Sequence, residues 1–141
     1  MDVLYTAEAL ASGGGRDGGQ VKTTDGRVDY VTAVPKDMGG SGEGINPELL
    51  FASGYSVCFL SALQHVGRAA KADLTDATVG AQVGIGSNGQ GGFELAVTLE
   101  VVIPNLPHDE AQALADQAHQ VCPYSNATRG NIDVKVVVTD D

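Results

Sequence analysis

Two cysteines are the residues of this sequence with the most direct chemical potential. Cys58 lies inside a long uncharged apolar stretch, and Cys122 immediately precedes Pro123. A free cysteine is either a small core residue or a redox-active or catalytic group, and the residues alone leave both interpretations open. A zinc site is not expected, because the sequence has no C-x-x-C motif and its three histidines are scattered.

A reactive cysteine would need a cation to favour its thiolate, since a free thiol with a pKa of about 8.5 is only slightly ionised near neutrality. Arg16 is the candidate, because glycines on both sides leave few competing side chains. Glu48 is its natural partner, because a carboxylate holds a planar guanidinium in a bidentate pair. The alternatives are a solvated loop arginine and an ordinary acid at a helix start.

One helical distance limits how these residues could act together. A helix from Glu48 to Cys58 would rise about 15 Å, so we do not expect direct contact between the two side chains. Glu48 could then influence Cys58 only through the arm of Arg16, a kink in the helix, or a subunit boundary.

Composition and charge exclude several classes of protein. The 141 residues carry a net charge of −10, which repels nucleic acids and anionic membrane surfaces. No secretory signal follows Met1, so we expect a cytoplasmic protein. The uncharged run from Leu49 to Leu63 is shorter than the roughly 20 residues of a spanning helix. Because it is apolar or small on all sides, we expect a core helix that is buried all round.

The elements that must position these residues follow from periodicity and from turn residues. The chain length fits a single domain over residues 1–141, and the grouping of elements predicts an α+β fold. Asn46 is a helix N-cap candidate, with Pro47 at the first helical position. The expected elements are two or three strands within residues 1–34 (including 3–6 and 28–34, with a turn at Asp25-Gly26), a flexible loop at 38–44, a helix from 46 to about 71, a hairpin of 78–85 with 93–101, a helix at about 108–121 that Pro123 stops, and a strand at 132–139.

Several blocks of the sequence, taken in order, resemble one known family. They are Val3-Leu4-Tyr5-Thr6-Ala7, Gly15-Arg16-Asp17-Gly18, Asn46-Pro47-Glu48 through Leu50-Phe51-Ala52 to Cys58-Phe59, Gly91-Gly92-Phe93, and Val121-Cys122-Pro123-Tyr124-Ser125-Asn126-Ala127-Thr128-Arg129-Gly130-Asn131. From end to end the chain resembles the organic hydroperoxide resistance (Ohr) proteins of the OsmC-like superfamily. The last block distinguishes them from the sister OsmC branch.

The resemblance implies a fold, a site and a set of partners. The fold would have antiparallel sheets packed around a long buried central helix, in an intertwined homodimer with active sites at the interface. Cys58 would be the peroxidatic cysteine and Cys122 the resolving one, with Arg16 and Glu48 as the activating pair. The substrates would be organic hydroperoxides. The enzyme would bind no cofactor, and the dihydrolipoyl dithiol of a lipoylated carrier protein would reduce it.

Such an enzyme would act through a Cys58 sulfenic acid, which Cys122 converts to a disulfide. Apolar residues around Cys58, from Phe51 to Phe59, would suit a substrate with a hydrocarbon tail. Two alternatives remain. A cysteine hydrolase with a histidine base would leave Cys122 without a role. A binding protein for fatty acids would leave both cysteines inert to peroxide.

Overall fold

The computed structural model describes residues 1–140, and its chain forms two compact units. The first is Met1–Leu50, and the second begins at Phe51. Each unit has a three-stranded sheet of its own. The α+β class is therefore confirmed, while the single domain expected from chain length stays a prediction.

The first unit contains an antiparallel meander of β1 (Ala9–Gly13), β2 (Gly19–Thr23) and β3 (Asp29–Val31), followed by a short 3-10 helix at Lys36–Met38. The predicted turn at Asp25-Gly26 joins β2 to β3. Gly26 adopts φ 77°, and its N–H donates to the Thr23 carbonyl. Glycine suits this turn because it reaches the left-handed region without strain.

The strand predicted at residues 3–6 is wrong, because these residues lie outside every strand of the described chain. The β1 register begins at Ala9 opposite Thr23, the last residue of β2. No length of β2 therefore remains for residues 3–6 to pair with. The residue at which β1 begins is set by backbone pairing with β2, which the sequence pattern does not reveal.

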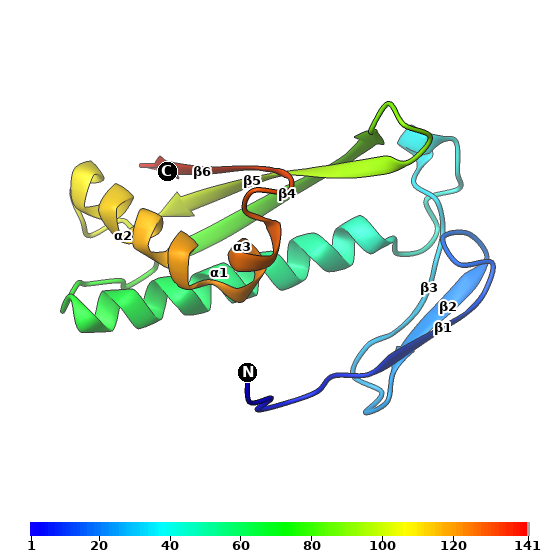
Figure 1. Cartoon of the computed structure of the whole chain (residues 1–141), viewed down its shortest axis with the longest axis horizontal. Helices are drawn as coiled ribbons and strands as arrows, with labels where there is room; N and C mark the ends of the chain where they lie inside the picture. Colours follow the sequence, from blue (N-terminus) through cyan, green and yellow to red (C-terminus); the bar gives the residue numbers. More distant parts are fainter. Residues whose placement is uncertain (141) are drawn as a thin grey trace. The chain divides into compact units, whose positions relative to one another are not determined.

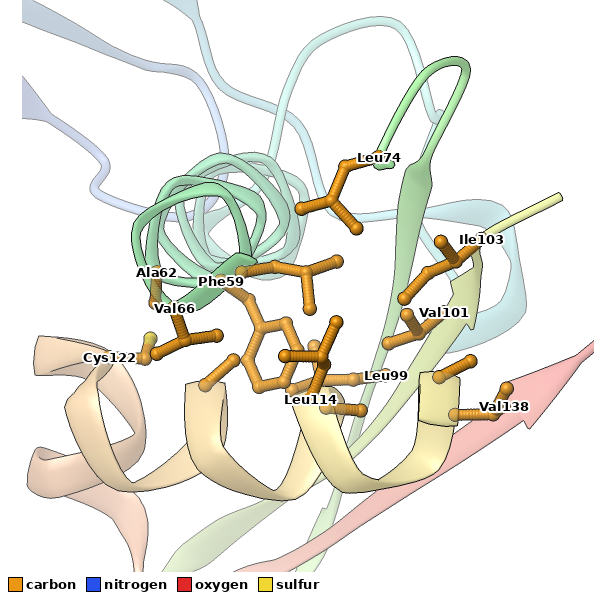
Figure 2. Packing of buried hydrophobic residues seen from close by; sticks show 14 of the residues in the cluster. Phe59, Ala62, Val66, Leu74, Leu99, Val101, Ile103, Leu114, Cys122 and Val138 are labelled. Atoms are coloured by element: carbon orange, nitrogen blue, oxygen red, sulfur yellow. The ribbon is translucent and has the colours of Figure 1, made fainter. Parts of the chain in front are cut away.

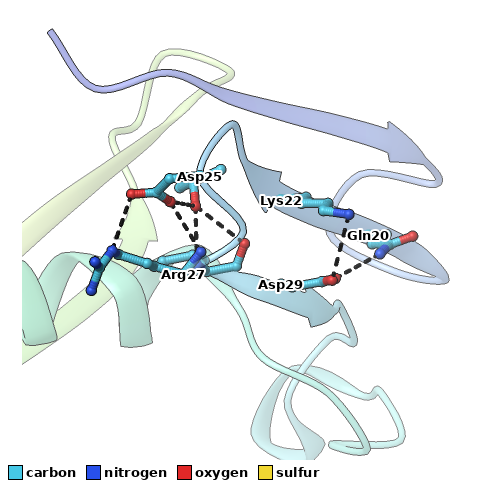
Figure 3. A network of polar contacts seen from close by, with 7 residues as sticks. Gln20, Lys22, Asp25, Arg27 and Asp29 are labelled. Atoms are coloured by element: carbon cyan, nitrogen blue, oxygen red, sulfur yellow. Dashed lines mark hydrogen bonds and ion pairs between the residues drawn. The ribbon is translucent and has the colours of Figure 1, made fainter.

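The first unit has almost no hydrophobic core. Among its residues only Ala33 is a buried apolar side chain. The surface of its sheet instead carries polar contacts, drawn in Figure 3: the Gln20 amide donates to Asp29 at 2.7 Å, and Arg27 pairs with Asp25 at 3.5 Å. Exposed pairs of this kind contribute little to stability, because water screens the two charges. Polar contacts alone do not account for a stable three-stranded sheet.

The long helix α1 (Pro47–Ala69) begins and ends as its sequence predicts, to within two residues. The Leu49 N–H donates to the Asn46 side chain at 2.9 Å, which confirms the expected N-cap. The helix ends at Ala69 rather than at Lys71. Lys71 has a left-handed φ of 56°, and the Ala72 N–H closes the end on the Gly67 carbonyl.

The second unit contains a mixed sheet in the order β4-β5-β6. β4 (Thr78–Ser87) and β5 (Phe93–Val102) form the predicted antiparallel hairpin, and β6 (Asp133–Thr139) pairs parallel to β5. We expected antiparallel sheets. The parallel pairing is possible because α2 (His108–Val121) and α3 (Pro123–Thr128) connect β5 to β6 and return the chain to the same end of the sheet. The helix α3 was not expected from the sequence.

One hydrophobic core lies between the helices and a single face of this sheet (Figures 1 and 2). Alternate β5 residues Val97, Leu99 and Val101 are buried, and Glu100 between them is exposed. Since α1 and α2 both pack on that face, β5 is covered from one side. The buried side chains of α1 repeat with helical spacing and form one stripe: Tyr55, Phe59, Ala62, Leu63, Val66 and Gly67.

The prediction that α1 is buried all round is wrong for the single chain. Val57, on the side away from the core, is 67% exposed, and Leu49, in the first turn of the helix, is 53% exposed. The sequence is apolar on every side of α1, but only one side meets the sheet and α2. With 23 residues, α1 is also long and apolar enough to cross a membrane, contrary to our expectation from the shorter uncharged run. Core helices pass the same test, so this is weak evidence for a membrane span.

Gly67 provides a test of this core. A Cβ on Gly67 would collide with the Leu74 side chain. Gly67→Ala should therefore lower the free energy of unfolding by about 1–3 kcal/mol, despite the better helix propensity of alanine. Urea unfolding measures this change. In a Leu74→Ala background the same substitution should become neutral or stabilising, and an equal cost in both backgrounds would contradict the packing described here.

Candidate functional site

The structure brings the two cysteines together. Cys58 Sγ lies 3.5 Å from Cys122 Sγ, and the Cys122 thiol donates a hydrogen bond to Cys58. Both are free thiols; Cys122 is fully buried, and Cys58 is half-buried. A disulfide needs an S–S distance of about 2.05 Å, so a small approach of the two sulfurs would allow a bond once an oxidant removes two electrons and two protons.

Three helices position this sulfur pair. Cys58 lies on α1 at the edge of its buried stripe, beside the core residue Phe59. Cys122 occupies the junction of α2 and α3: its N–H donates to the Ala118 carbonyl, and its own carbonyl accepts from the Asn126 N–H. Pro123 prevents α2 from continuing and suits the first position of α3. The cysteine is thus fixed at a break between two helices.

The surroundings of Cys58 favour its neutral form. Burial raises the pKa of the Cys58 thiol, and a hydrogen bond from the Tyr124 backbone N–H opposes this rise only in part. Within the second unit, therefore, the thiolate does not form readily. A peroxidatic role requires a positive charge from elsewhere.

Arg16 and Glu48 form the bidentate ion pair that the sequence suggested. Arg16 Nη1 lies 2.9 Å from Glu48 Oε2, and Nη2 lies 2.7 Å from Oε1. The Glu48 side chain is 12% exposed and that of Arg16 41%. The guanidinium lowers the pKa of the Glu48 carboxyl, and the carboxylate raises the pKa of Arg16. The guanidinium is therefore charged and held in one orientation by the fork of the carboxylate.

The loop that carries Arg16 is itself tied down. The Thr32 hydroxyl donates to the Gly15 carbonyl and accepts from the Gly19 N–H at 3.0 Å. A Cβ on Gly14 would collide with the Asp17 carbonyl oxygen, so this tight loop requires glycine there. The glycines around Arg16 therefore allow a compact backbone turn. This turn limits where the Arg16 guanidinium can lie.

An aromatic cluster joins α1 to the helix that follows Cys122. The rings of Phe51, Tyr55 and Tyr124 lie 5.6–5.9 Å apart in a cluster. A Cβ on Gly54 would lie only 2.7 Å from the Tyr124 hydroxyl, so glycine lets the Tyr124 ring approach α1. The spacing of Tyr55 three residues before Cys58 was a usable signal, but sequence reasoning treated it only as apolar surroundings.

Arg129 holds the segment that follows Cys122. Its guanidinium donates to the His119 carbonyl at 2.8 Å and to the Asn126 side chain. It therefore binds a free carbonyl at the C-terminal end of α2. Arg129 therefore has a structural role in this loop.

The remaining titratable side chains offer little for other chemistry. Among residues 1–140, no group of three or more His, Cys, Asp or Glu side chains gathers closely enough to hold a metal ion. His119 uses its Nδ1 atom in a 2.8 Å hydrogen bond with Ser125. The neighbour of the Cys58 sulfur is another thiol rather than an imidazole base. This arrangement suits redox chemistry better than hydrolysis.

Two thiols in contact across the helices of an α+β fold are an arrangement suited to redox chemistry, and comparison with known proteins gives the family. Residues 40–137 match the OsmC-like protein model. The organic hydroperoxide resistance protein of Xanthomonas axonopodis pv. citri (strain 306) is 46% identical over 138 residues, covering 96% of this chain and 95% of the relative. The chain belongs to the OsmC-like family.

Further relatives point to one branch of that family. Organic hydroperoxide resistance protein OhrB of Bacillus subtilis (strain 168) is 40% identical over 134 residues, 94% of this chain and 96% of the relative. The crystal structure of an organic hydroperoxide resistance protein from Elizabethkingia anophelis matches with a TM-score of 0.93 at 49% identity, covering 100% of both chains. The Ohr branch is therefore the place of this chain within the family, as its sequence blocks predicted.

The Arg16–Glu48 pair predicts a specific titration. Because the folded pKa of Glu48 is depressed, the pair stabilises the fold above the ordinary glutamate pKa and loses that contribution as the pH falls through the folded value. Carboxyl NMR should show Glu48 titrating below the ordinary glutamate range. In Arg16→Ala its pKa should move back up, and in Arg16→Lys only part of the way, since lysine has no fork. An ordinary pKa in the unaltered protein would contradict the ion pair.

Proposed function

We propose that this protein is a thiol peroxidase that reduces organic hydroperoxides to alcohols and acts in the response to oxidative stress in the cytoplasm. The observation that carries the proposal is the 3.5 Å contact between a half-buried thiol and a fully buried one. The names of the relatives support organic hydroperoxides as the substrate class. The apolar rings of Phe51 and Tyr124 near the site suit a substrate with a hydrocarbon tail.

In the first step, the Cys58 thiolate attacks the distal oxygen of the hydroperoxide. The O–O bond breaks, an S–O bond forms, and the alkoxide leaves as the alcohol after taking a proton. Cys58 is oxidised to a sulfenic acid. We propose that Arg16, oriented by Glu48, stabilises the thiolate and the charge that develops on the departing oxygen. Burial raises the pKa of Cys58, so the proposal gives this cation an essential role.

In the second step, Cys122 attacks the sulfenic sulfur of Cys58. An S–S bond forms, and the hydroxyl group leaves as water with the proton of the Cys122 thiol. The short contact between the sulfurs supports this step, because the resolving thiol is next to Cys58 before the peroxide arrives. Disulfide formation protects Cys58 from further, irreversible oxidation.

A dithiol then regenerates the two cysteines by thiol–disulfide exchange. The co-substrate that we propose is the dihydrolipoyl group of a lipoylated carrier protein, so no bound cofactor or metal enters the cycle. Two successive exchanges release the oxidised cyclic disulfide and restore both thiols. A reducing compartment such as the cytoplasm is consistent with this cycle.

We further propose that the protein acts as a homodimer. Two features of the single chain support this: the exposed apolar side of α1, represented by Val57 and Leu49, and a first unit whose only buried apolar residue is Ala33. A soluble chain with this much uncovered apolar surface gains stability by burying it against a second copy.

The two cysteine substitutions test the peroxidase directly. With dihydrolipoamide as reductant, Cys58→Ser should abolish consumption of cumene hydroperoxide. Cys122→Ser should retain one round of oxidation and then accumulate over-oxidised Cys58, visible by mass spectrometry. A matched control is Ser56→Ala, which lies two residues from Cys58 and leaves both thiols in place. Peroxide turnover that survives the Cys122 change would favour a single-cysteine peroxidase, in which the added dithiol reduces the Cys58 sulfenic acid directly.

The dimer has a separate test. Val57→Asp would place a charge within the apolar surface that we assign to the partner, where its desolvation is costly. Sedimentation equilibrium should show a dimer for the unaltered protein and a shift toward monomer for Val57→Asp. The control is Lys135→Asp, a charge change on β6. A monomeric unaltered protein, or equal behaviour of the two variants, would contradict the proposal.

A further inference from the structure

A buried chain of hydrogen bonds connects the three helices around the cysteines. Tyr55 of α1 and Ser125 of α3 are both fully buried, and their hydroxyls lie 2.8 Å apart. Ser125 Oγ also lies 2.8 Å from His119 Nδ1 of α2. On its other side, the Tyr55 hydroxyl lies 3.1 Å from Thr128 Oγ1 of α3. No buried side-chain N or O atom within residues 1–140 lacks a partner, so this chain is fully satisfied.

The direction of these hydrogen bonds follows from counting protons. Thr128 donates its single hydroxyl proton to the Tyr124 carbonyl at 2.9 Å, so it accepts from Tyr55. Tyr55 has then used its proton and accepts from Ser125. Ser125 in turn has used its proton and accepts from His119. In the neutral ring this makes Nδ1 the protonated nitrogen.

The chain runs from His119 through Ser125 and Tyr55 to Thr128, and it ends on the carbonyl of Tyr124. The same residue, Tyr124, donates its backbone N–H to the Cys58 sulfur. Cys122 is only two residues earlier, at the start of α3. The hydrogen bonds therefore tie α3 to α1 and α2 on both sides of the segment that presents Cys122 and the Tyr124 N–H to Cys58.

We propose that Tyr55, Ser125, Thr128 and His119 are positioning residues for the disulfide-forming step, which hold the resolving thiol against Cys58. The inference rests on the proposed function for its place in catalysis, and on the sulfur contact for its geometry. None of the four residues exchanges a proton or an electron in the step itself. The sulfenic acid of Cys58 and the thiol of Cys122 give the disulfide and water, as before.

The position of these residues predicts that they affect resolution more strongly than peroxide attack. Resolution needs the Cys122 thiol aligned with Cys58, whereas the Tyr124 N–H only partly offsets the raised pKa of Cys58. Displacement of a reacting group by about 1 Å can slow a step by roughly 10²-fold. Tyr55→Phe removes one hydroxyl, and with it one hydrogen bond of Ser125 and one of Thr128. We expect disulfide formation to slow by about tenfold or more. In a Cys122→Ser background, the rate at which Cys58 is first oxidised should fall by less than the rate of disulfide formation does.

The first experiment measures how the Cys58 sulfenic acid divides between two fates. One equivalent of cumene hydroperoxide is added to the reduced protein, and an excess is added afterwards. Mass spectrometry then quantifies the disulfide, which reports reaction with Cys122, and the sulfinic acid, which reports reaction with a second peroxide. Tyr55→Phe should raise the over-oxidised fraction per turnover, whereas Tyr30→Phe, an exposed tyrosine of β3, should not. Because both products arise from one folded intermediate, the ratio is independent of the folded fraction. An unchanged ratio overturns the inference.

His119 permits a milder pair of variants if Tyr55→Phe does not fold. Asparagine places an amide N–H close to the position of Nδ1, and leucine fills similar space without a donor. His119→Asn should keep the partition of the unaltered protein, and His119→Leu should shift it toward over-oxidation. Equal behaviour of the two variants would overturn the role of the donated hydrogen bond.

A second experiment separates this inference from the peroxidase itself. Diamide oxidises the two thiols to a disulfide without any peroxide, by taking two electrons and two protons. Tyr55→Phe and His119→Leu should slow this reaction about tenfold, even if the protein consumed no hydroperoxide. Failure to consume peroxide would then refute the proposed function alone, and unchanged diamide rates would refute the positioning role alone.

Discussion

The contact between two thiols at a helix junction is the constraint on which the site depends. Cys122 lies where α2 ends and α3 begins, and Pro123 makes that break unavoidable. The carbonyl and N–H groups of the junction are satisfied by neighbouring turns, and Arg129 binds a further carbonyl of α2. The second sulfur comes from α1, whose buried stripe fixes its rotation against the sheet. A thiol that is held this closely can react with a sulfenic acid before a second peroxide does.

A second constraint is electrostatic. The core that brings the sulfurs together also raises the pKa of Cys58, which works against a reactive thiolate. The guanidinium of Arg16 is a cation held in a fixed orientation by its bidentate ion pair with Glu48. Tight packing around the thiols and a separately held cation are thus complementary requirements of the proposed mechanism.

Much of the fold could be predicted from the sequence, because local rules govern the elements concerned. The Asn46 N-cap, the hairpin of β4 with β5 and the stop at Pro123 follow from residue type and periodicity. Sequence reasoning failed where distant pairing decides the structure. It expected a strand at residues 3–6, for which β2 has no length left, and it did not find the parallel pairing of β6. It also expected α1 to be buried all round. That expectation failed because apolar residues on every side of a helix do not reveal how many neighbouring elements the same chain supplies to cover them.

The candidate site was predictable to a similar degree. Cys58, Cys122, Arg16 and Glu48 were found from chemistry and resemblance, and the structure places them as two close pairs. The chain of Tyr55, Ser125, Thr128 and His119 was missed, because three hydroxyls and one imidazole spread over three helices carry no spacing signal until the helices are packed.

The central claim is that an organic hydroperoxide converts the two neighbouring thiols into one disulfide. The most direct measurement adds one equivalent of cumene hydroperoxide to the reduced protein, counts the free thiols, and maps the linkage by peptide mass spectrometry. The account predicts one molecule of alcohol and one Cys58–Cys122 disulfide for each peroxide consumed. Two intact thiols and unreacted hydroperoxide would contradict it.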